Sequence, residues 1–231
     1  MDLVIRNVNS TRQALNRCTG FREPAASRGR WGYRWGVSAE PSGKARGLSR
    51  HPSLDDRFDP AVRMVDYHPE WPLLADAELL RIRARLGAVA ARLEHVGSTA
   101  VPGLAAKPIL DLQVSVPDVA RQDAYVGPLT ALGYLFAPDP ASLDYHFFGK
   151  PPERPRSYHL HVCEVGSAHE FRHLAVRDFL RSHPDEVGSY AALKRRVAAR
   201  VGADRLAYIE GKDAYVAALE ERALAWKRSG I

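Results

Sequence analysis

Apolar and polar positions follow ordered patterns mainly after the first sixty residues of the chain. The clearest pattern starts at Trp71, where apolar residues recur near the helical spacing and predict a long helix to about Leu93. It is carried by Leu73, Leu74, Ala77, Leu80, Ile82, Leu86, Val89 and Leu93. A second helix is predicted at 118–132, beginning with a cap at Asp118 and with a potential break at Pro128. Three more helices are predicted near 168–182, 185–201 and 204–228.

Five short apolar runs predict strands. They lie at roughly 94–98, 108–116, 134–137, 145–148 and 158–165. The last run contains His159-Leu160-His161-Val162, an alternation that is typical of a strand with one polar face. Because strands and helices are mixed and the C-terminal third is helical, the sequence predicts an α+β fold. We expect a small mixed sheet with helices on one face, followed by a helical C-terminal third.

The first sixty residues show weak periodicity, with Gly, Pro, Ser and Arg scattered throughout. This composition predicts a basic, disordered extension at 1–60 and one domain at 61–231. The extension holds 11 Lys and Arg against 6 Asp and Glu, so it carries most of the formal net charge of +6. The charge is therefore weak support for a nucleic-acid-binding domain, because the rest of the chain is close to neutral.

Two hypotheses concern the extension itself. Residues 28–36 alternate basic, aromatic and glycine residues, so nucleic acid could bind there, although an unstructured segment is the simpler interpretation. Met64 stands where the ordered pattern begins, which leaves an internal start of the protein at this position as a second hypothesis.

The sequence also indicates a cellular setting. No run of about 18 apolar residues without charge is present, so neither a membrane-spanning helix nor a membrane partner is expected. The N-terminus lacks the apolar stretch of a secretory signal. Cys18 and Cys163 are far apart and indicate neither a disulfide framework nor a metal knuckle. A reducing, cytoplasmic location is the resulting expectation.

The candidate chemistry is concentrated between the first two predicted strands. A glycine at the end of a strand, here Gly97, lets the backbone approach a phosphate, and Ser98 offers both a hydroxyl and an N–H group. Lys107 would add positive charge across the loop. Asp111 lies inside an apolar run, where a carboxylate is costly to bury unless a metal, a cation or hydrogen bonds hold it. This pattern predicts a site for a nucleotide or another phosphate-bearing ligand.

A second carboxylate is missing from this site. Gln113 shares the strand face of Asp111, where a two-metal site would have an acid, because Mg²⁺ and Mn²⁺ prefer anionic oxygen ligands. A bound Mg²⁺ or Mn²⁺ is therefore expected to be held weakly, or not to be needed. His159 and His161 also share one face, and two such histidines can bind a transition metal or contact phosphate. The alternative is that they form a half-buried polar strand face.

The chain resembles the GrpB family over residues 64–228. The resemblance is carried by residues 67–71, 95–111, 159–162 and 177–181, and by Tyr190 with Lys194. The GrpB family is similar to the nucleotidyltransferase superfamily, whose pattern is Gly-Ser, a spacer, and then acid–apolar–acid. Ser98 and Asp111 match that pattern and Gln113 departs from it. In some bacteria a similar domain is fused to dephospho-CoA kinase, where it assists the kinase rather than catalysing.

The resemblance implies a nucleotidyltransferase-like fold and leaves three functions open. The first is a binding or accessory module for a nucleotide or phosphate-bearing molecule. The second is a metal-dependent nucleotidyltransferase with catalytic Asp111, His159 and His161, of which Asp111 and His161 would hold the metal. The third is nucleic-acid binding through the extension. The predicted phosphate-binding residues are Gly97, Ser98, Thr99, Lys107 and Lys194.

Overall fold

The computed structural model of the chain describes residues 62–138, 144–151 and 156–230, and the predicted extension at 1–60 lies outside them. The helices of the described part are α1 (Trp71–Leu86), α2 (Val126–Thr130), α3 (Ala168–Ser182), α4 (Pro184–Val201) and α5 (Arg205–Arg228). The strands are β1 (Arg92–Val96), β2 (Leu110–Val116), β3 (Leu135–Ala137), β4 (Tyr145–Lys150) and β5 (Tyr158–Glu164). Three short 3-10 helices are η6 (Gly87–Val89), η7 (Ser98–Ala100) and η8 (Gln122–Ala124).

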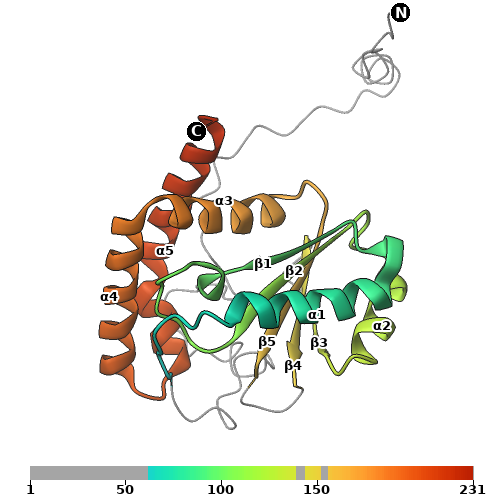
Figure 1. Cartoon of the computed structure of the whole chain (residues 1–231), viewed down its shortest axis with the longest axis horizontal. Coiled ribbons are helices and arrows are strands. Elements are labelled where there is room, and N and C mark those ends of the chain that lie inside the picture. The colour runs from blue at the N-terminus through green and yellow to red at the C-terminus, as the bar shows by residue number, and fades with distance from the viewer. Residues whose placement is uncertain (1–61, 139–143, 152–155, 231) are drawn as a thin grey trace, which may run out of the picture. The chain divides into compact units, whose positions relative to one another are not determined.

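The five strands form one mixed sheet in the order β1-β2-β5-β4-β3 (Figure 1). The neighbours β2 and β5 run parallel, whereas the other neighbouring strands are antiparallel. The register places Asp111 beside His159 and Gln113 beside His161. The polar positions of β2 and of β5, which are far apart in the sequence, are therefore adjacent in the sheet.

Strands β2 and β5 have one apolar and one polar face, as their alternation predicts. The apolar side chains are buried and pack with α1 and α2 in one core. From the strands this core takes Leu110, Leu112, Val114, Val116, Leu160 and Val162, and from the two helices Trp71, Ala75, Ile82, Leu86 and Leu129. Burying this set supplies the main hydrophobic stabilisation on that side of the sheet.

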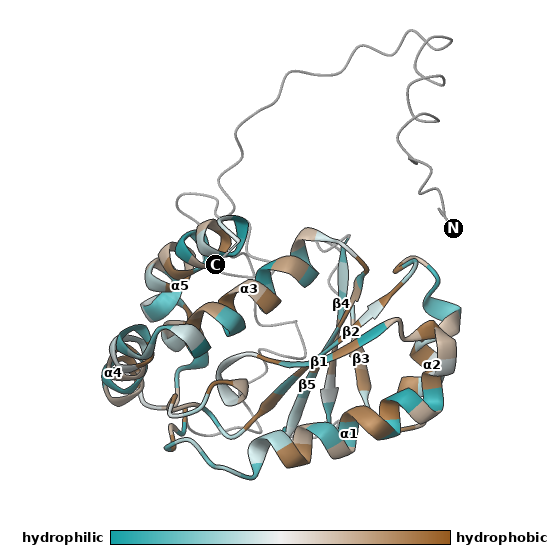
Figure 2. Ribbon diagram, turned by 45° about the horizontal axis from the view of Figure 1, so that its top comes forward, coloured by the Kyte–Doolittle hydropathy of each residue, from teal (hydrophilic) through white to brown (hydrophobic). Residues whose placement is uncertain are grey.

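The opposite face of the sheet is also covered. In Figure 2, α1 lies along one side of the sheet and α3 along the other. The expectation of helices on one face only is therefore wrong, because the polar face of β2 and β5 is buried under α3. The mixed α+β fold and its helical C-terminal third are confirmed. In the described part of the chain, no helix combines the length and the apolar character that crossing a membrane requires.

Two predicted helices differ from the observed ones. The helix expected over 71–93 ends at Leu86, because Gly87 has a φ of 54° and its N–H bonds to the Arg83 carbonyl. Leu93 then lies in β1 and pairs with β2. The helix expected over 118–132 is reduced to α2, because the Asp118 carboxylate accepts from the Ala120 N–H at 2.9 Å and forms a turn instead of a helix cap.

Candidate functional site

A cavity of about 220 Å³ lies on the polar side of the sheet. Its walls come from the segment between β1 and β2, from the strands β2 and β5, and from α3, α4 and α5. Every residue that the sequence predicts for the site lines this cavity: Gly97, Ser98, Thr99, Lys107, Asp111, His159, His161 and Lys194. The fold thus brings together residues from the β1–β2 segment, β2, β5 and α4, and their chemical roles stay predictions.

Gly97 allows the backbone to pass very close to Asp111. Its φ of 69° is a left-handed value that favours glycine. A Cβ atom at this position would lie 2.8 Å from the Cβ of Asp111, and closer still to its Oδ2. Any larger residue would therefore push against the carboxylate. The observed position of Asp111 therefore requires a glycine at position 97.

Asp111 and His159 form a hydrogen-bonded pair across β2 and β5. The Nδ1 of His159 lies 3.2 Å from Oδ1 of Asp111. Burial opposes ionisation of Asp111, but the hydrogen bond from His159 and the nearby positive charge of Lys107 hold the pKa of the carboxyl below its usual value. Burial also lowers the pKa of His159, against the effect of Asp111. The pair at neutral pH is then a carboxylate that accepts from a neutral imidazole.

Lys194 reaches the same loop from α4. It is only 2% exposed, and its Nζ donates to Ser98 Oγ at 2.9 Å. The Nζ also lies 4.4 Å from the ring centre of Tyr190. Burial lowers the pKa of Lys194 to about 7, and the nearby positive charge of Lys212 adds to the shift. Lys194 can therefore be either charged or neutral near physiological pH.

Two further predicted residues take different places on the wall. The Thr99 hydroxyl lies 2.9 Å from Nε2 of His95, so this side chain already has a partner on β1. Burial lowers the pKa of His95 to about 4, which keeps its imidazole neutral. Lys107 is half-buried, and its Nζ lies 5.7 Å from the Tyr208 ring centre. His146 of β4 contacts Tyr125 and does not line the cavity.

Gln113 occupies the position of the second acid in the superfamily pattern, but its side chain has a different role. It is fully buried, and its Oε1 accepts from Nδ1 of His173 on α3 at 3.0 Å. It does not line the cavity, although Asp111 two residues earlier does. The amide therefore positions a histidine that the sequence interpretation missed. A signal was available, because His169 and His173 are four residues apart and so share one face of a helix.

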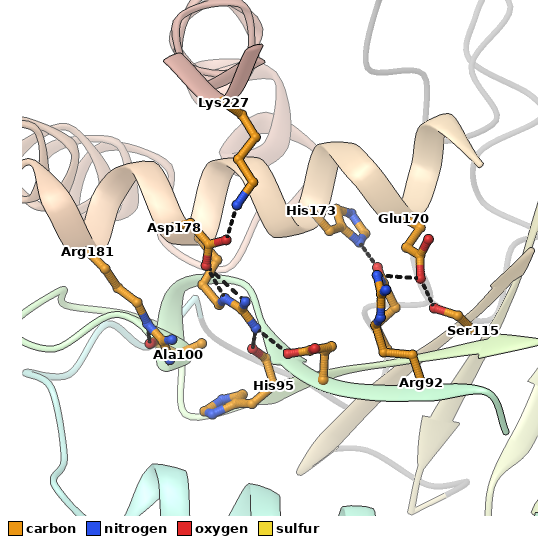
Figure 3. Close-up of polar contacts among 12 residues, drawn as sticks. Arg92, His95, Ala100, Ser115, Glu170, His173, Asp178, Arg181 and Lys227 are labelled. Atoms are coloured by element: carbon orange, nitrogen blue, oxygen red, sulfur yellow. Dashed lines mark hydrogen bonds and ion pairs between the residues drawn. The ribbon is translucent and has the colours of Figure 1, made fainter. Parts of the chain in front are cut away.

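Helix α3 is held to the sheet by polar contacts along one face. Glu170 accepts from Ser115 Oγ at 2.5 Å and from Arg92 at 3.1 Å. One helical turn after another, His173, Arg177 and Arg181 also reach toward the strands and the loop between β1 and β2. Figure 3 shows this row, with Glu170, His173 and Arg181 pointing the same way from the helix. The row fixes the cavity wall that α3 contributes.

Arg177 has three partners in this structure. Its guanidinium donates to the Glu94 carboxylate at 2.6 Å, to the His95 carbonyl at 3.1 Å, and to Asp178 at 2.9 Å. Arg177 therefore pairs with its chain neighbour Asp178 and adds long-range bonds to β1. Asp178 in turn accepts from Lys227 of α5 at 2.9 Å. These contacts join α3, α5 and the sheet.

Comparison with known proteins places this arrangement in a family. The chain is 41% identical over 173 residues to a UPF0157 protein of Pseudomonas aeruginosa, which covers 74% of this chain and 71% of that protein. It is 34% identical over 194 residues to a protein of Mycolicibacterium paratuberculosis named dephospho-CoA kinase. That match covers 73% of this chain but 47% of the kinase.

A solved structure agrees with the sequence comparisons. The crystal structure of the conserved protein GrpB from Enterococcus faecalis matches with a TM-score of 0.66 and 30% identity. The match covers 71% of this chain and 99% of the Enterococcus chain. Residues 61–222, which include every residue that lines the cavity, match the model of the GrpB protein family. The chain therefore belongs to the GrpB family.

Proposed function

We propose that the GrpB domain of this chain binds a phosphate-bearing ligand of the nucleotide class in the cavity beside Gly97, Ser98 and Asp111. The observation that carries the proposal is the charge of the wall. Its basic residues are Lys107, Arg177, Lys194, Arg205 and Lys212, and its acidic residues are Asp111 and Glu220. An excess of positive charge in a partly enclosed cavity favours an anion.

The lysines are the best candidates for the anion contact. Arg177 is already paired with Glu94 and Asp178, whereas the three lysines come from the loop before β2, from α4 and from α5. Ammonium groups from three elements can surround a phosphate as a set of point charges. Ser98 would add a hydroxyl to this set. The backbone N–H groups beside Gly97 could approach the ligand without a side chain in the way.

The site supports binding better than metal-dependent nucleotidyl transfer. A two-metal mechanism needs paired carboxylates, and Asp111 is the one acid on β2. Gln113, at the place of the second acid, has its oxygen occupied by His173. These residues do not fit a Mg²⁺ or Mn²⁺ pair, so we propose binding that proceeds in the presence of a chelator. A role as an accessory module is consistent with this proposal.

The relatives suggest which ligands to try first. Since some are named dephospho-CoA kinase, ATP and dephospho-CoA are the first two probes, with inorganic phosphate as the third. We expect calorimetric titration of the full chain in EDTA to show binding of at least one of them. If none of the three binds, with or without Mg²⁺, the proposed function is contradicted.

Replacing Lys212 is expected to weaken that binding. Lys212→Met removes a charge from the cavity wall while keeping a long apolar stem, so we expect about 10- to 100-fold lower affinity, as for loss of a hydrogen bond to a charged group. Lys227→Met is the matched control, because it removes the same charge from α5 outside the cavity. Equal affinities of the two variants would show that the ligand lies elsewhere.

Binding is also expected to depend on pH through Lys194. The folded pKa of about 7 means that a bound anion must stabilise the protonated amine, so binding takes up a proton near pH 7–8. Affinity should fall as pH rises above about 7, by up to about tenfold per pH unit. The folding stability of the ligand-free protein should depend on pH in the opposite direction. The unfolded chain holds the Lys194 proton more tightly than the folded chain, so the free energy of unfolding increases as pH rises from about 7 toward 10.5.

Calorimetry in buffers of different ionisation enthalpy measures this proton uptake directly. The uptake should disappear in Lys194→Met, whose side chain fits the same apolar surroundings. Uptake that persists in this variant would assign the proton to another group and contradict the role of Lys194.

A further inference from the structure

Three histidines meet at the inner wall of the cavity. His161 belongs to β5, and His169 and His173 belong to α3. Each offers one ring nitrogen, and the three nitrogens lie within 4.8 Å of one another. The ring centres of His169 and His173 are 4.2 Å apart, and the ring of His161 lies 5.0 Å from that of His173. This spacing is short enough for one ion to contact all three.

The ring of His169 is costly to bury as it stands. His161 and His169 are each 3% exposed, and His169 Nε2 has no hydrogen-bond partner among the described residues. A buried polar nitrogen without a partner destabilises a fold by about 1–3 kcal/mol. A metal ion bound by the cluster would give this nitrogen a partner. The neutral imidazole is the form that binds metal ions.

The surroundings orient the rings. Gln113 Oε1 accepts from the Nδ1–H of His173, which leaves Nε2 of that ring with a lone pair. Tyr145 stacks on His169 with ring centres 4.0 Å apart and so fixes its plane. Metal-binding histidines usually donate their second nitrogen to an oxygen in this way. This contact also gives a reason for an amide, and not an acid, at position 113: Gln113 orients the His173 ring toward a metal ion.

We propose that His161, His169 and His173 hold one transition-metal ion of the zinc class. Three imidazoles form a borderline-soft nitrogen set, which suits Zn²⁺ and not the Mg²⁺ or Mn²⁺ expected at Asp111. A site with three protein ligands keeps a fourth position for water or a ligand oxygen. His161 and His173 line the cavity, so that position would be reached from it. The proposal does not depend on phosphate binding.

The test measures zinc on the full chain. After treatment with a chelator and its removal, the protein is dialysed against Zn²⁺ and the bound zinc is measured. We expect about one equivalent, an increase in thermal stability, and a tetrahedral visible spectrum when Co²⁺ replaces Zn²⁺. His169→Phe should abolish this binding while keeping a ring against Tyr145. Gln113→Leu should lower the affinity by about 10- to 100-fold, because it leaves His173 unoriented.

The matched control is His183→Phe. His183 also stacks on an aromatic ring, that of Phe179 at 3.9 Å, but lies outside the cluster. This variant should bind zinc as the unchanged chain does. His173→Gln provides a second ligand variant, so the test remains decisive if His169→Phe does not fold. The proposal is overturned by absent zinc binding, by binding unchanged in the folded ligand variants, or by binding that Asp111→Asn abolishes and His169→Phe leaves intact.

Discussion

The Gly97→Ala variant is expected to lose ligand binding in the cavity and about 2–5 kcal/mol of unfolding free energy. Two effects combine. The positive φ costs about 1–2 kcal/mol for any residue with a Cβ atom. The added methyl group would also overlap with Asp111, and overpacking of this kind costs about 1–3 kcal/mol. Because the carboxylate must move, the Asp111–His159 hydrogen bond should be lost with the binding. Chemical denaturation and calorimetric titration measure the two effects.

Gly87→Ala separates the two contributions. Gly87 also has a positive φ, of 54°, but no atom lies within 4 Å of a Cβ built there. This variant should lose only the conformational part of the free energy and keep its ligand affinity. If Gly97→Ala is no less stable than Gly87→Ala and binds ligand normally, then the close approach to Asp111 has no functional meaning.

The sequence predicts that the loop and strand residues of the candidate site lie close together, and they line one cavity for a physical reason. Gly97 and Ser98 lie in the segment between β1 and β2, and Asp111 lies on β2, so short spacing along the chain limits their separation in space. The alternation of His159 and His161 places both on one strand face whatever the rest of the fold does. What the sequence leaves open is which strand lies next to β2. The parallel pairing with β5 answers this, since it sets Asp111 beside His159.

The missed residues depend on long-range packing. Nothing in the pattern of α3 tells which element its polar face will meet, so His173 with Gln113 and Glu170 with Ser115 are not predictable from periodicity. The expected helix position near 168–182 is confirmed, because Ser167 caps the N–H of Glu170. The expectation of helices on one side of the sheet is wrong for the same reason, because α3 covers the polar face of the sheet. An amphipathic pattern detects an apolar face and gives no sign that a polar face is buried as well.

The buried polar face makes Glu170 a residue of large expected effect. It is 4% exposed and accepts from Ser115, from Arg92 and, at 2.6 Å, from the Gly166 N–H. Glu170→Ala would leave these donors without their acceptor under α3. The Arg92 side chain is 49% exposed, so water can replace its contact, and the cost comes from the Ser115 hydroxyl and the Gly166 N–H. A buried donor without an acceptor costs about 1–3 kcal/mol, so we expect a total loss of about 2–6 kcal/mol. Because α3 carries His169 and His173, the variant should also weaken any metal binding at the three histidines.

The Glu186→Ala variant tests whether burial causes the loss of unfolding free energy expected for Glu170→Ala. Glu186 likewise lies in the first turn of its helix and pairs with an arginine, Arg222, at 2.9 Å. Its side chain is 27% exposed and that of Arg222 is 43% exposed, so water can replace the lost contact and we expect a cost of about 1 kcal/mol or less. Both changes remove the same group and the same favourable charge near a helix N-terminus. Denaturation curves that show equal losses for the two variants would mean that the contacts of Glu170 with the sheet do not anchor α3.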